Sequence, residues 1–297
     1  DARAALHGEV IEQELDDLSV LQGSFVQLKS GSWVYQETTG NKDAPTILML
    51  HTAGADTRQW HGLMTIPEMR ERWNLVAFDV PGHGRSPLPK GQENWNWLLD
   101  EKQYMTWIID FIEAAKLKNV VLMGCSMGAA ISIALLANYG EQFSGGILLE
   151  TPYRSPGRRS PFLDHPKVHG NRLAATWVAS LLSPQSPKVR RDYAKWIYSQ
   201  GAPSVYDGDL AFYSDEFSAN HHTSKINTAK TPLWLLTGDY DYSASPEETM
   251  KVVNEIPGAK FTRLSGFGHF PMTEDPKRLY KEYLQAVLEE CSQKVNT

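Results

Sequence analysis

Residues 119–139 read NVVLMGCSMGAAISIALLANY, and this stretch decides the fold. The run NVVLM is continuously apolar, as in a strand that is buried on both faces of a parallel sheet. Residues 127–138 are rich in Ala, Ile and Leu and predict a buried helix. Between them Ser126 stands in the pattern G-x-S-x-G, flanked by Gly124 and Gly128. A strand followed at once by a helix predicts one unit of an α/β sheet, with a tight turn at the serine.

Further apolar runs lie on both sides of this unit and alternate with segments of helical periodicity. Short continuous runs such as TILML and NLVAF are typical of strands inside a parallel sheet. Their alternation with helices predicts a doubly wound, mostly parallel α/β sheet with right-handed crossovers. We expect the other strands at 25–29 and 32–37, which form a hairpin, and at 46–50, 74–78, 146–149, 233–236 and 261–264, with further helices at 104–115 and 276–291.

The composition changes over residues 152–230. This segment is rich in proline, carries many basic residues in its first half and then a dense aromatic series, and helical patterns occupy 172–182 and 189–199. An insertion between two sheet strands, on the side of their carboxyl ends, lies where a ligand crevice is expected. We therefore divide the chain into a sheet-based core, residues 1–151 and 231–297, and a mostly helical cap, residues 152–230.

Composition and charge exclude several classes of function. The net charge of -6 offers no basic field for nucleic acid, and no apolar stretch approaches the roughly 18 residues of a membrane-spanning helix. We therefore expect neither a nucleic-acid nor a membrane partner. Cys125 and Cys291 follow no disulfide or metal spacing, which favours a reducing, cytoplasmic location. The chain begins at Asp1 rather than at methionine, which leaves the start of the natural protein open.

The turn at Ser126 has the features of a nucleophile site. Gly124 and Gly128 carry no side chains that would collide with the neighbouring strand and helix, so the backbone can reverse within about three residues. The turn projects the Ser126 hydroxyl from the edge of the sheet, at the N-terminus of the following helix. Free N–H groups and the helix dipole favour a developing anion there.

A serine alcohol is a weak nucleophile until a base takes its proton, and that base needs an acid to orient it. His269 lies on the glycine-rich stretch GFGHFP after the last predicted strand. Asp241 follows the strand LWLL, and it is better placed than Asp239 because the chain has by then turned back over the sheet edge. Ser126, Asp241 and His269 each follow a strand at the carboxyl edge of the sheet, and we predict that they form a catalytic triad.

With these motifs the chain resembles the α/β-hydrolase superfamily over nearly its whole length. HTAG at 51–54 stands where the family carries its oxyanion loop, and DVPGHGRS at 79–86 resembles the family's turn after the next strand. The stretch around His269 is similar to the histidine loop of the serine esterase, lactonase and C–C hydrolase branches. The resemblance implies the α/β-hydrolase fold with a helical cap. No loop resembles a phosphate or cofactor cradle, so we expect no cofactor.

The resemblance also implies roles for individual groups. The N–H groups of Met127 and Ala53 would form the oxyanion hole. Because the family's H-G reads H-T in this chain, the N–H of Thr52 is an alternative to that of Ala53. Glu150 ends the strand GILL, from which some family members take the triad acid, so it is an alternative to Asp241.

A serine at the turn implies attack on a carbonyl and an acyl-enzyme, whereas the dehalogenase and epoxide hydrolase branches carry aspartate at this position. Carboxylic esters and lactones are the leading substrates. One alternative is hydrolysis of a C–C bond beside a ketone. Another is a small-ligand receptor or a non-hydrolytic, cofactor-free enzyme on the same fold.

The aromatic residues indicate a medium-sized apolar or aromatic substrate. Trp60, Trp95 and Trp97 fall near predicted loops, in addition to the aromatic series of the cap. The adjacent His221 and His222 lack partner ligands, so we expect no metal site. The length of the chain is compatible with a monomer or a homodimer. The residues expected to line the substrate pocket are Trp177, Tyr153, Tyr213 and Phe270.

Overall fold

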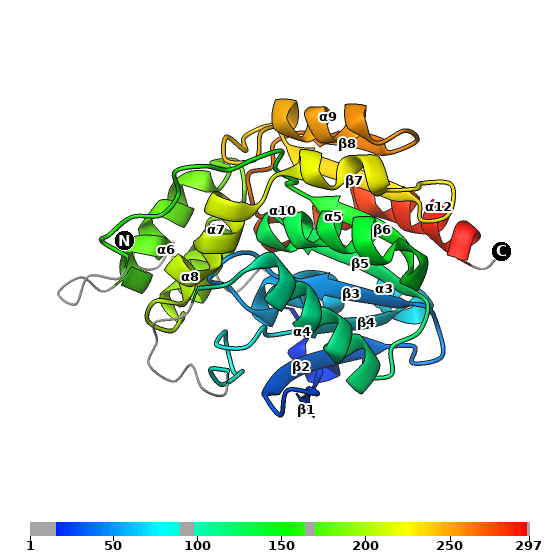
Figure 1. Cartoon of the computed structure of the whole chain (residues 1–297), viewed down its shortest axis with the longest axis horizontal. Helices are drawn as coiled ribbons and strands as arrows, with labels where there is room; N and C mark the ends of the chain where they lie inside the picture. Colours follow the sequence, from blue (N-terminus) through cyan, green and yellow to red (C-terminus); the bar gives the residue numbers. More distant parts are fainter. Residues whose placement is uncertain (1–15, 90–97, 164–169, 296–297) are drawn as a thin grey trace, which may run out of the picture.

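The computed structural model describes residues 16–89, 98–163 and 170–295. Within these residues an eight-stranded sheet has the order β1-β2-β4-β3-β5-β6-β7-β8 (Figure 1). The pairs β1–β2 and β2–β4 are antiparallel and all other neighbours are parallel. The doubly wound, mostly parallel sheet predicted from the sequence is confirmed. The strands are β1 Gln22–Gln27, β2 Trp33–Gly40, β3 Thr46–Leu50, β4 Asn74–Phe78, β5 Val120–Cys125, β6 Phe143–Leu149, β7 Leu233–Gly238 and β8 Lys260–Leu264.

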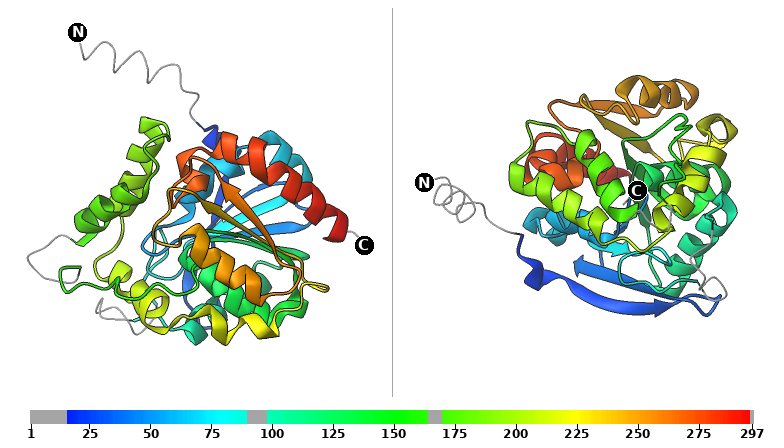
Figure 2. Two further views of the ribbon diagram at one scale, coloured as in Figure 1. Left: turned by 90° about the horizontal axis from the view of Figure 1, so that it is seen from above. Right: turned by 90° about the vertical axis from the view of Figure 1, so that its left-hand side faces the viewer.

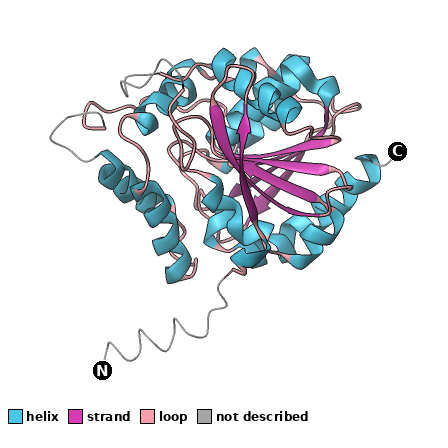
Figure 3. Cartoon of the chain, turned by 90° about the horizontal axis from the view of Figure 1, so that it is seen from below, coloured by secondary structure: helices cyan, strands magenta, loops and turns pink. Residues whose placement is uncertain are grey.

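Helices cover both faces of the sheet (Figure 3). On one face α4, α5 and α9 pack against alternate strand residues such as Leu48 and Leu122; on the other, α2, α3, α11 and α12 pack against Ile47 and Val121. Burial on both faces is why these strands read as continuous apolar runs. Among the described residues, no helix is both long and apolar enough to cross a membrane. These helices are α2 His61–Met64, α3 Pro67–Arg72, α4 Glu101–Ala114, α5 Met127–Tyr139, α9 Pro246–Glu255, α11 Pro276–Leu279 and α12 Gln285–Val295.

The chain between β6 and β7 forms a helical layer at one end of the sheet (Figure 2). It contains α6 (Gly170–Leu181), α7 (Lys188–Ser199) and α8 (Val205–Leu210), and α6 and α7 pack side by side. The first two of these helices coincide with the helical patterns predicted at 172–182 and 189–199. Their layer lies over the carboxyl ends of β5, β7 and β8, where the predicted site residues are found.

Predicted and observed elements differ mainly at their ends. β1 begins three residues before the strand predicted at 25–29, and the helix predicted at 276–291 is divided into α11, a wider turn over 280–284 and α12. The sequence did not predict α2 and α3, because helices of four and six residues are too short to show a period. It also missed α9, although Ser245 caps that helix by accepting the N–H of Glu248.

Candidate active site

Ser126 occupies the turn between β5 and α5. Its backbone has φ 54° and ψ −112°, a left-handed conformation that costs a non-glycine residue free energy and that the surrounding structure imposes. A Cβ on Gly124 would lie 2.2 Å from the carbonyl oxygen of Gly128, and a Cβ on Gly128 would lie 2.2 Å from that of Leu50. The steric requirement for glycine on both sides of the serine is therefore confirmed.

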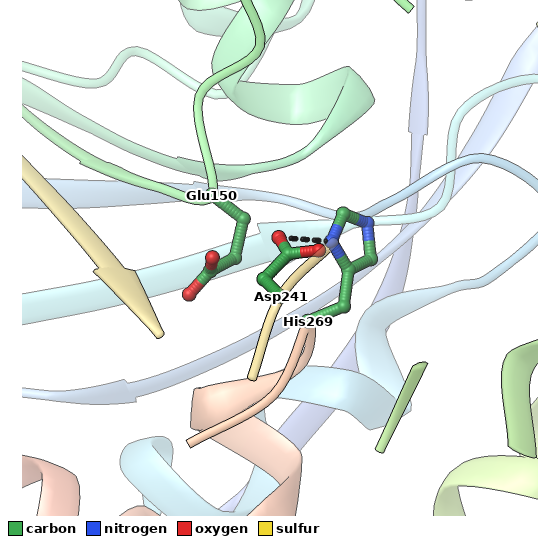
Figure 4. Close-up of side chains that lie close together, drawn as sticks. All are labelled: Glu150, Asp241 and His269. Atoms are coloured by element: carbon green, nitrogen blue, oxygen red, sulfur yellow. Dashed lines mark hydrogen bonds and ion pairs between the residues drawn. The ribbon is translucent and has the colours of Figure 1, made fainter. Parts of the chain in front are cut away.

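The structure brings Ser126, His269 and Asp241 into one hydrogen-bonded series. The Ser126 hydroxyl lies 2.9 Å from Nε2 of His269 and is placed to donate to it. On the other side of the ring, Nδ1–H donates to Oδ2 of Asp241 at 2.6 Å (Figure 4). All three side chains are almost completely buried. The series can take a proton from the serine and stabilise the imidazolium that results, as a nucleophile, base and acid require.

The carboxylate of Asp241 is held in place by the backbone. Its Oδ1 accepts the N–H groups of Ser243 and Ala244 at 2.7 and 3.1 Å, which leaves Oδ2 for the histidine. Burial acts to raise the pKa of Asp241, but the charge and hydrogen bond of His269 outweigh it and hold the pKa below its ordinary value. Asp241 is therefore an anion at neutral pH, aimed at the imidazole.

The loop that carries His269 is tied down by a buried carboxylate at the end of α10 (Pro271–Glu274). Oε2 of Glu274 accepts the N–H of Gly268 at 3.1 Å, and Oε1 accepts that of Phe270 at 3.0 Å. The N–H of His269 itself donates to the carbonyl of Leu181 at 3.0 Å. Each residue from Gly268 to Phe270 is thus fixed by its own hydrogen bond. The positioning role of Glu274 was not predicted from the sequence.

Glu150 lies behind Asp241 rather than against the histidine. One oxygen of Glu150, one of Asp241 and one ring nitrogen of His269 lie within 4.8 Å of one another, but it is Asp241 that accepts the hydrogen bond from the ring (Figure 4). Both Glu150 oxygens accept the N–H of Gly238, at 3.0 and 3.1 Å. Burial and the charge of Asp241 raise the pKa of Glu150 well above its usual range. A neutral Glu150 can donate to Asp241, and the geometry favours Asp241 over Glu150 as the triad acid.

This cluster offers three groups of the kinds that bind metals. Nδ1 of His269 and Oδ2 of Asp241 already share a hydrogen bond, and burial beside Asp241 disfavours the ionised form of Glu150 that would bind a metal. The potential metal-binding atoms of the cluster are therefore engaged with one another. Within the described ranges no other group of three such side chains comes together.

Two backbone N–H groups near Ser126 are available for an oxyanion. The N–H of Met127 begins α5, and that of Ala53 lies in the loop after β3; neither has a hydrogen-bond partner among the described residues. The N–H of Thr52, by contrast, donates to Oε1 of Gln59 at 3.1 Å. The geometry therefore favours Ala53 over Thr52 as the second donor.

Two side chains of the cap form hydrogen bonds with residues 51–54, the predicted oxyanion loop. Asp209 of α8 accepts the N–H of Gly54 at 2.6 Å and faces Nε2 of His83 at 2.7 Å through the same oxygen. The Tyr198 hydroxyl of α7 forms a short hydrogen bond with that of Thr52. Burial alone would lower the pKa of His83, but the charge of Asp209 raises it above the ordinary value. The shape of the loop thus depends on the cap being in place, which no sequence motif indicated.

A cavity of about 260 Å³ opens above Ser126 and His269. Three of the four residues expected in the pocket line it: Trp177, Tyr213 and Phe270. Other lining residues come from the cap and from the loop after β7, and they include Tyr198, Tyr206, Tyr242, Ser243 and Arg158.

The expectation for Tyr153 is wrong. Its side chain does not line the cavity; its hydroxyl donates to Oε1 of Glu255 on α9 at 2.6 Å, so the chain leaving β6 directs it outward. Trp60 is buried in the core beneath the sheet and is also no pocket residue. Trp95 and Trp97 lie outside the described residues.

Tyr213 contacts the Ser126 hydroxyl itself. Its hydroxyl lies 3.1 Å from Oγ of Ser126, so the serine oxygen has a tyrosine on one side and His269 on the other. Burial raises the pKa of Tyr213 to about 12, against opposing hydrogen bonds from Ser126 and Ser155 and the charge of Arg158. The hydroxyl is therefore protonated at neutral pH and can donate to the serine when the serine donates to the histidine.

Known proteins resemble this chain in sequence and in fold. A family model described as "Alpha/beta hydrolase family" matches residues 47–282. "Putative esterase/lipase 2" of Mycoplasma pneumoniae is 30% identical over 82% of this chain and 88% of its own. "Epoxide hydrolase 4" of Mus musculus is 24% identical over 84% of this chain and 74% of its own.

Solved structures show the same fold. The enol-lactonase from Burkholderia xenovorans LB400 superposes with a TM-score of 0.76 at 18% identity, over 92% of this chain and 100% of that one. A thermophilic esterase from Thermogutta terrifontis superposes with a TM-score of 0.70 at 19% identity, over 93% of this chain and 100% of that one.

Proposed function

The chain belongs to the alpha/beta hydrolase family and is a hydrolase, and we propose that it cleaves a carboxylic ester or lactone of a medium-sized apolar or aromatic molecule through an acyl-enzyme. The observation that carries this proposal is the continuous series Ser126–His269–Asp241 at the base of a cavity, with hydrogen bonds of 2.9 and 2.6 Å. The proposal is supported by a relative named as an esterase/lipase and by structural neighbours described as an enol-lactonase and an esterase.

The first half of the reaction forms the acyl-enzyme. Oγ of Ser126 attacks the carbonyl carbon while Nε2 of His269 takes its proton, and Asp241 stabilises the imidazolium. The carbonyl oxygen becomes an anion facing the N–H groups of Met127 and Ala53. When the tetrahedral intermediate collapses, the C–O bond to the alcohol breaks and Nε2 returns the proton to the leaving oxygen.

In the second half, water replaces the alcohol. Nε2 of His269 takes a proton from the water, the resulting hydroxide attacks the acyl carbon, and Ser126 leaves with the proton that the histidine returns. The products are a carboxylic acid and the alcohol, or one hydroxy acid from a lactone. The chemistry uses groups of this chain and water only.

The cavity supports a substrate of moderate size. A volume of about 260 Å³ accommodates a small aromatic or branched aliphatic ester and excludes a long acyl chain lying wholly inside. Trp177, Tyr206 and Phe270 provide apolar surface for it.

An active-site probe tests the proposal directly. The intact mass of the protein is measured after incubation with a fluorophosphonate, beside Ser126→Ala, with turnover of phenyl acetate followed in parallel. We expect one adduct per chain and turnover in the native protein, and neither in Ser126→Ala with unchanged circular dichroism. Adduct formation without hydrolysis of any ester or lactone would favour C–C bond hydrolysis. Absence of the adduct in the folded protein would contradict an activated serine and favour a receptor or a non-hydrolytic enzyme.

A further inference from the structure

One permanent charge faces the cavity above Ser126. Among the described residues that line it, Arg158 is the only lysine, arginine, aspartate or glutamate; the rest are aromatic, aliphatic or hydroxyl-bearing, apart from His269. Arg158 lies in the segment between β6 and α6 and is only partly exposed. A wall of this composition offers no anionic group to balance the positive charge of the guanidinium.

The hydrogen bonds of Arg158 leave its charge unneutralised. Nε donates to the Ser155 hydroxyl at 3.2 Å and Nη2 donates to the carbonyl of Ser243 at 3.2 Å, both neutral acceptors. Its backbone N–H donates to the Ser214 hydroxyl at 2.9 Å. No ion pair of the described residues includes Arg158, and Nη1 has no hydrogen-bond partner there.

The adjacent Arg159 provides the contrast. Its guanidinium pairs with Asp207 at 2.6 Å and with Asp215 at 3.3 Å, and it does not line the cavity. The two consecutive arginines of this segment therefore differ in whether a carboxylate balances their charge. Arg159 is neutralised by the cap, whereas Arg158 turns toward the site with a free nitrogen.

The distance from Arg158 to the nucleophile is bounded by a series of hydrogen bonds. Nε of Arg158 donates to the Ser155 hydroxyl at 3.2 Å, and the Tyr213 hydroxyl lies 3.1 Å from Oγ of Ser126. The Ser155 hydroxyl lies close enough to Tyr213 to act on its pKa. These two distances and an approach of about 3 to 4 Å between Ser155 and Tyr213 place the guanidinium at most about 10 Å from the serine oxygen. A substrate of the size that the cavity admits can span this distance.

We propose that Arg158 forms a subsite for a carboxylate on the substrate, so that the preferred esters or lactones carry an anionic group a few bonds from the scissile carbonyl. This inference rests on the proposed ester hydrolysis at Ser126. The planar guanidinium matches a carboxylate in shape and charge and binds it through parallel N–H bonds.

The geometry limits where that carboxylate sits. The scissile carbon lies about 3 Å from Oγ of Ser126 in the attacking geometry, and a carboxylate approaches the guanidinium nitrogens to about 3 Å. At most about 4 Å then separates the two groups of the substrate. Half-esters of short dicarboxylic acids, such as succinate and glutarate, have about this spacing.

The test compares substrates that differ only in charge. The first pair is methyl hydrogen succinate and its neutral amide analogue, methyl succinamate; the second is methyl hydrogen glutarate and methyl glutaramate. The ratio of kcat/KM, carboxylate over carboxamide, is measured for the native protein, Arg158→Gln, Arg158→Lys and the control Arg159→Gln. Thermal unfolding checks that each variant is folded.

We expect the native ratio to be at least about tenfold in one pair, the size of a charge-assisted hydrogen bond in a partly buried site. It should fall to near one in Arg158→Gln, keep part of its value in Arg158→Lys, and stay unchanged in Arg159→Gln. A purely structural Arg158 would instead lower both members of a pair alike and leave the ratio as it was. A native ratio near one in both pairs, or the same ratio in Arg158→Gln, would overturn the subsite.

The outcomes separate this inference from the proposed function. Hydrolysis of the neutral esters with labelling of Ser126 but no charge preference would reject the subsite and leave ester hydrolysis standing. If no ester is turned over but Ser126 is still labelled, protection from the fluorophosphonate by succinate and not by succinamide supports the anion site, and equal protection rejects it. Failure of both labelling and turnover rejects both proposals.

Discussion

Replacing Glu150 with glutamine removes one titrating group from the interior and keeps the size of the side chain. The amide oxygen can still accept the N–H of Gly238, and the amide nitrogen can donate to Asp241, as the neutral carboxyl does. Because Asp241, not Glu150, accepts the hydrogen bond from His269, we expect Glu150→Gln to keep kcat within a few-fold of the native value at pH 7.

The structure also predicts how this substitution changes stability with pH. Burial and the charge of Asp241 raise the pKa of Glu150 well above the value of 4.5 that applies to an unperturbed glutamate. Between these two values the folded protein holds a proton that the unfolded chain has released. The contribution of Glu150 to the free energy of unfolding is therefore fully present below about pH 4.5 and falls by about 1.4 kcal/mol per pH unit above it. The loss continues until the pH reaches the pKa of Glu150 in the folded state, and glutamine, which does not titrate, avoids it.

Urea unfolding at pH 5, 6 and 7 measures this difference. Relative to the native protein, Glu150→Gln should gain stability as the pH rises from 5 to 7, by up to about 1.4 kcal/mol per pH unit, whereas the exposed control Glu71→Gln should show a flat difference. A pH-independent difference for Glu150→Gln would mean that Glu150 is ionised in the folded protein and would refute the reasoning. A loss of kcat larger than that of Asp241→Asn would make Glu150 the triad acid.

Three further substitutions test the site. Asp241→Asn should lower kcat by about 10³- to 10⁴-fold in the ester assay with little change in the unfolding midpoint, because the amide leaves the histidine in the wrong tautomer; a loss below tenfold would contradict its role. Asp209→Asn should weaken the hydrogen bond that holds the oxyanion loop at Gly54 and lower kcat by about 10- to 100-fold with KM nearly constant. The control Asp207→Asn changes the ion pair with Arg159 and should keep kcat. Equal effects of the two substitutions would rule out a specific role of Asp209 at the oxyanion loop. Tyr213→Phe removes the hydroxyl beside Ser126 and should slow fluorophosphonate labelling less than tenfold, and a larger loss would make that hydroxyl essential.

The strands and the positions that follow them were predictable because their signals are local. A buried strand, a glycine-flanked serine and an apolar helix follow one another within 119–139, and their steric consequences stay within a few ångströms of the turn. The loops carrying Asp241 and His269 were predicted by the same logic, since parallel strands bring their carboxyl ends to one edge. The short helices α2 and α3 escaped prediction because a single turn has no period.

By itself, the sequence determined the sheet, the turn at Ser126 and the set of residues that could complete a triad. Only the tertiary structure decided which carboxylate reaches His269, that Tyr153 faces away from the cavity, and that the cap supplies Asp209 and Arg158. Asp209 reaches the oxyanion loop across 155 positions of sequence. The reason is physical: backbone periodicity records which face of an element is buried, whereas the partner of a polar side chain depends on how distant helices pack, which no local pattern encodes.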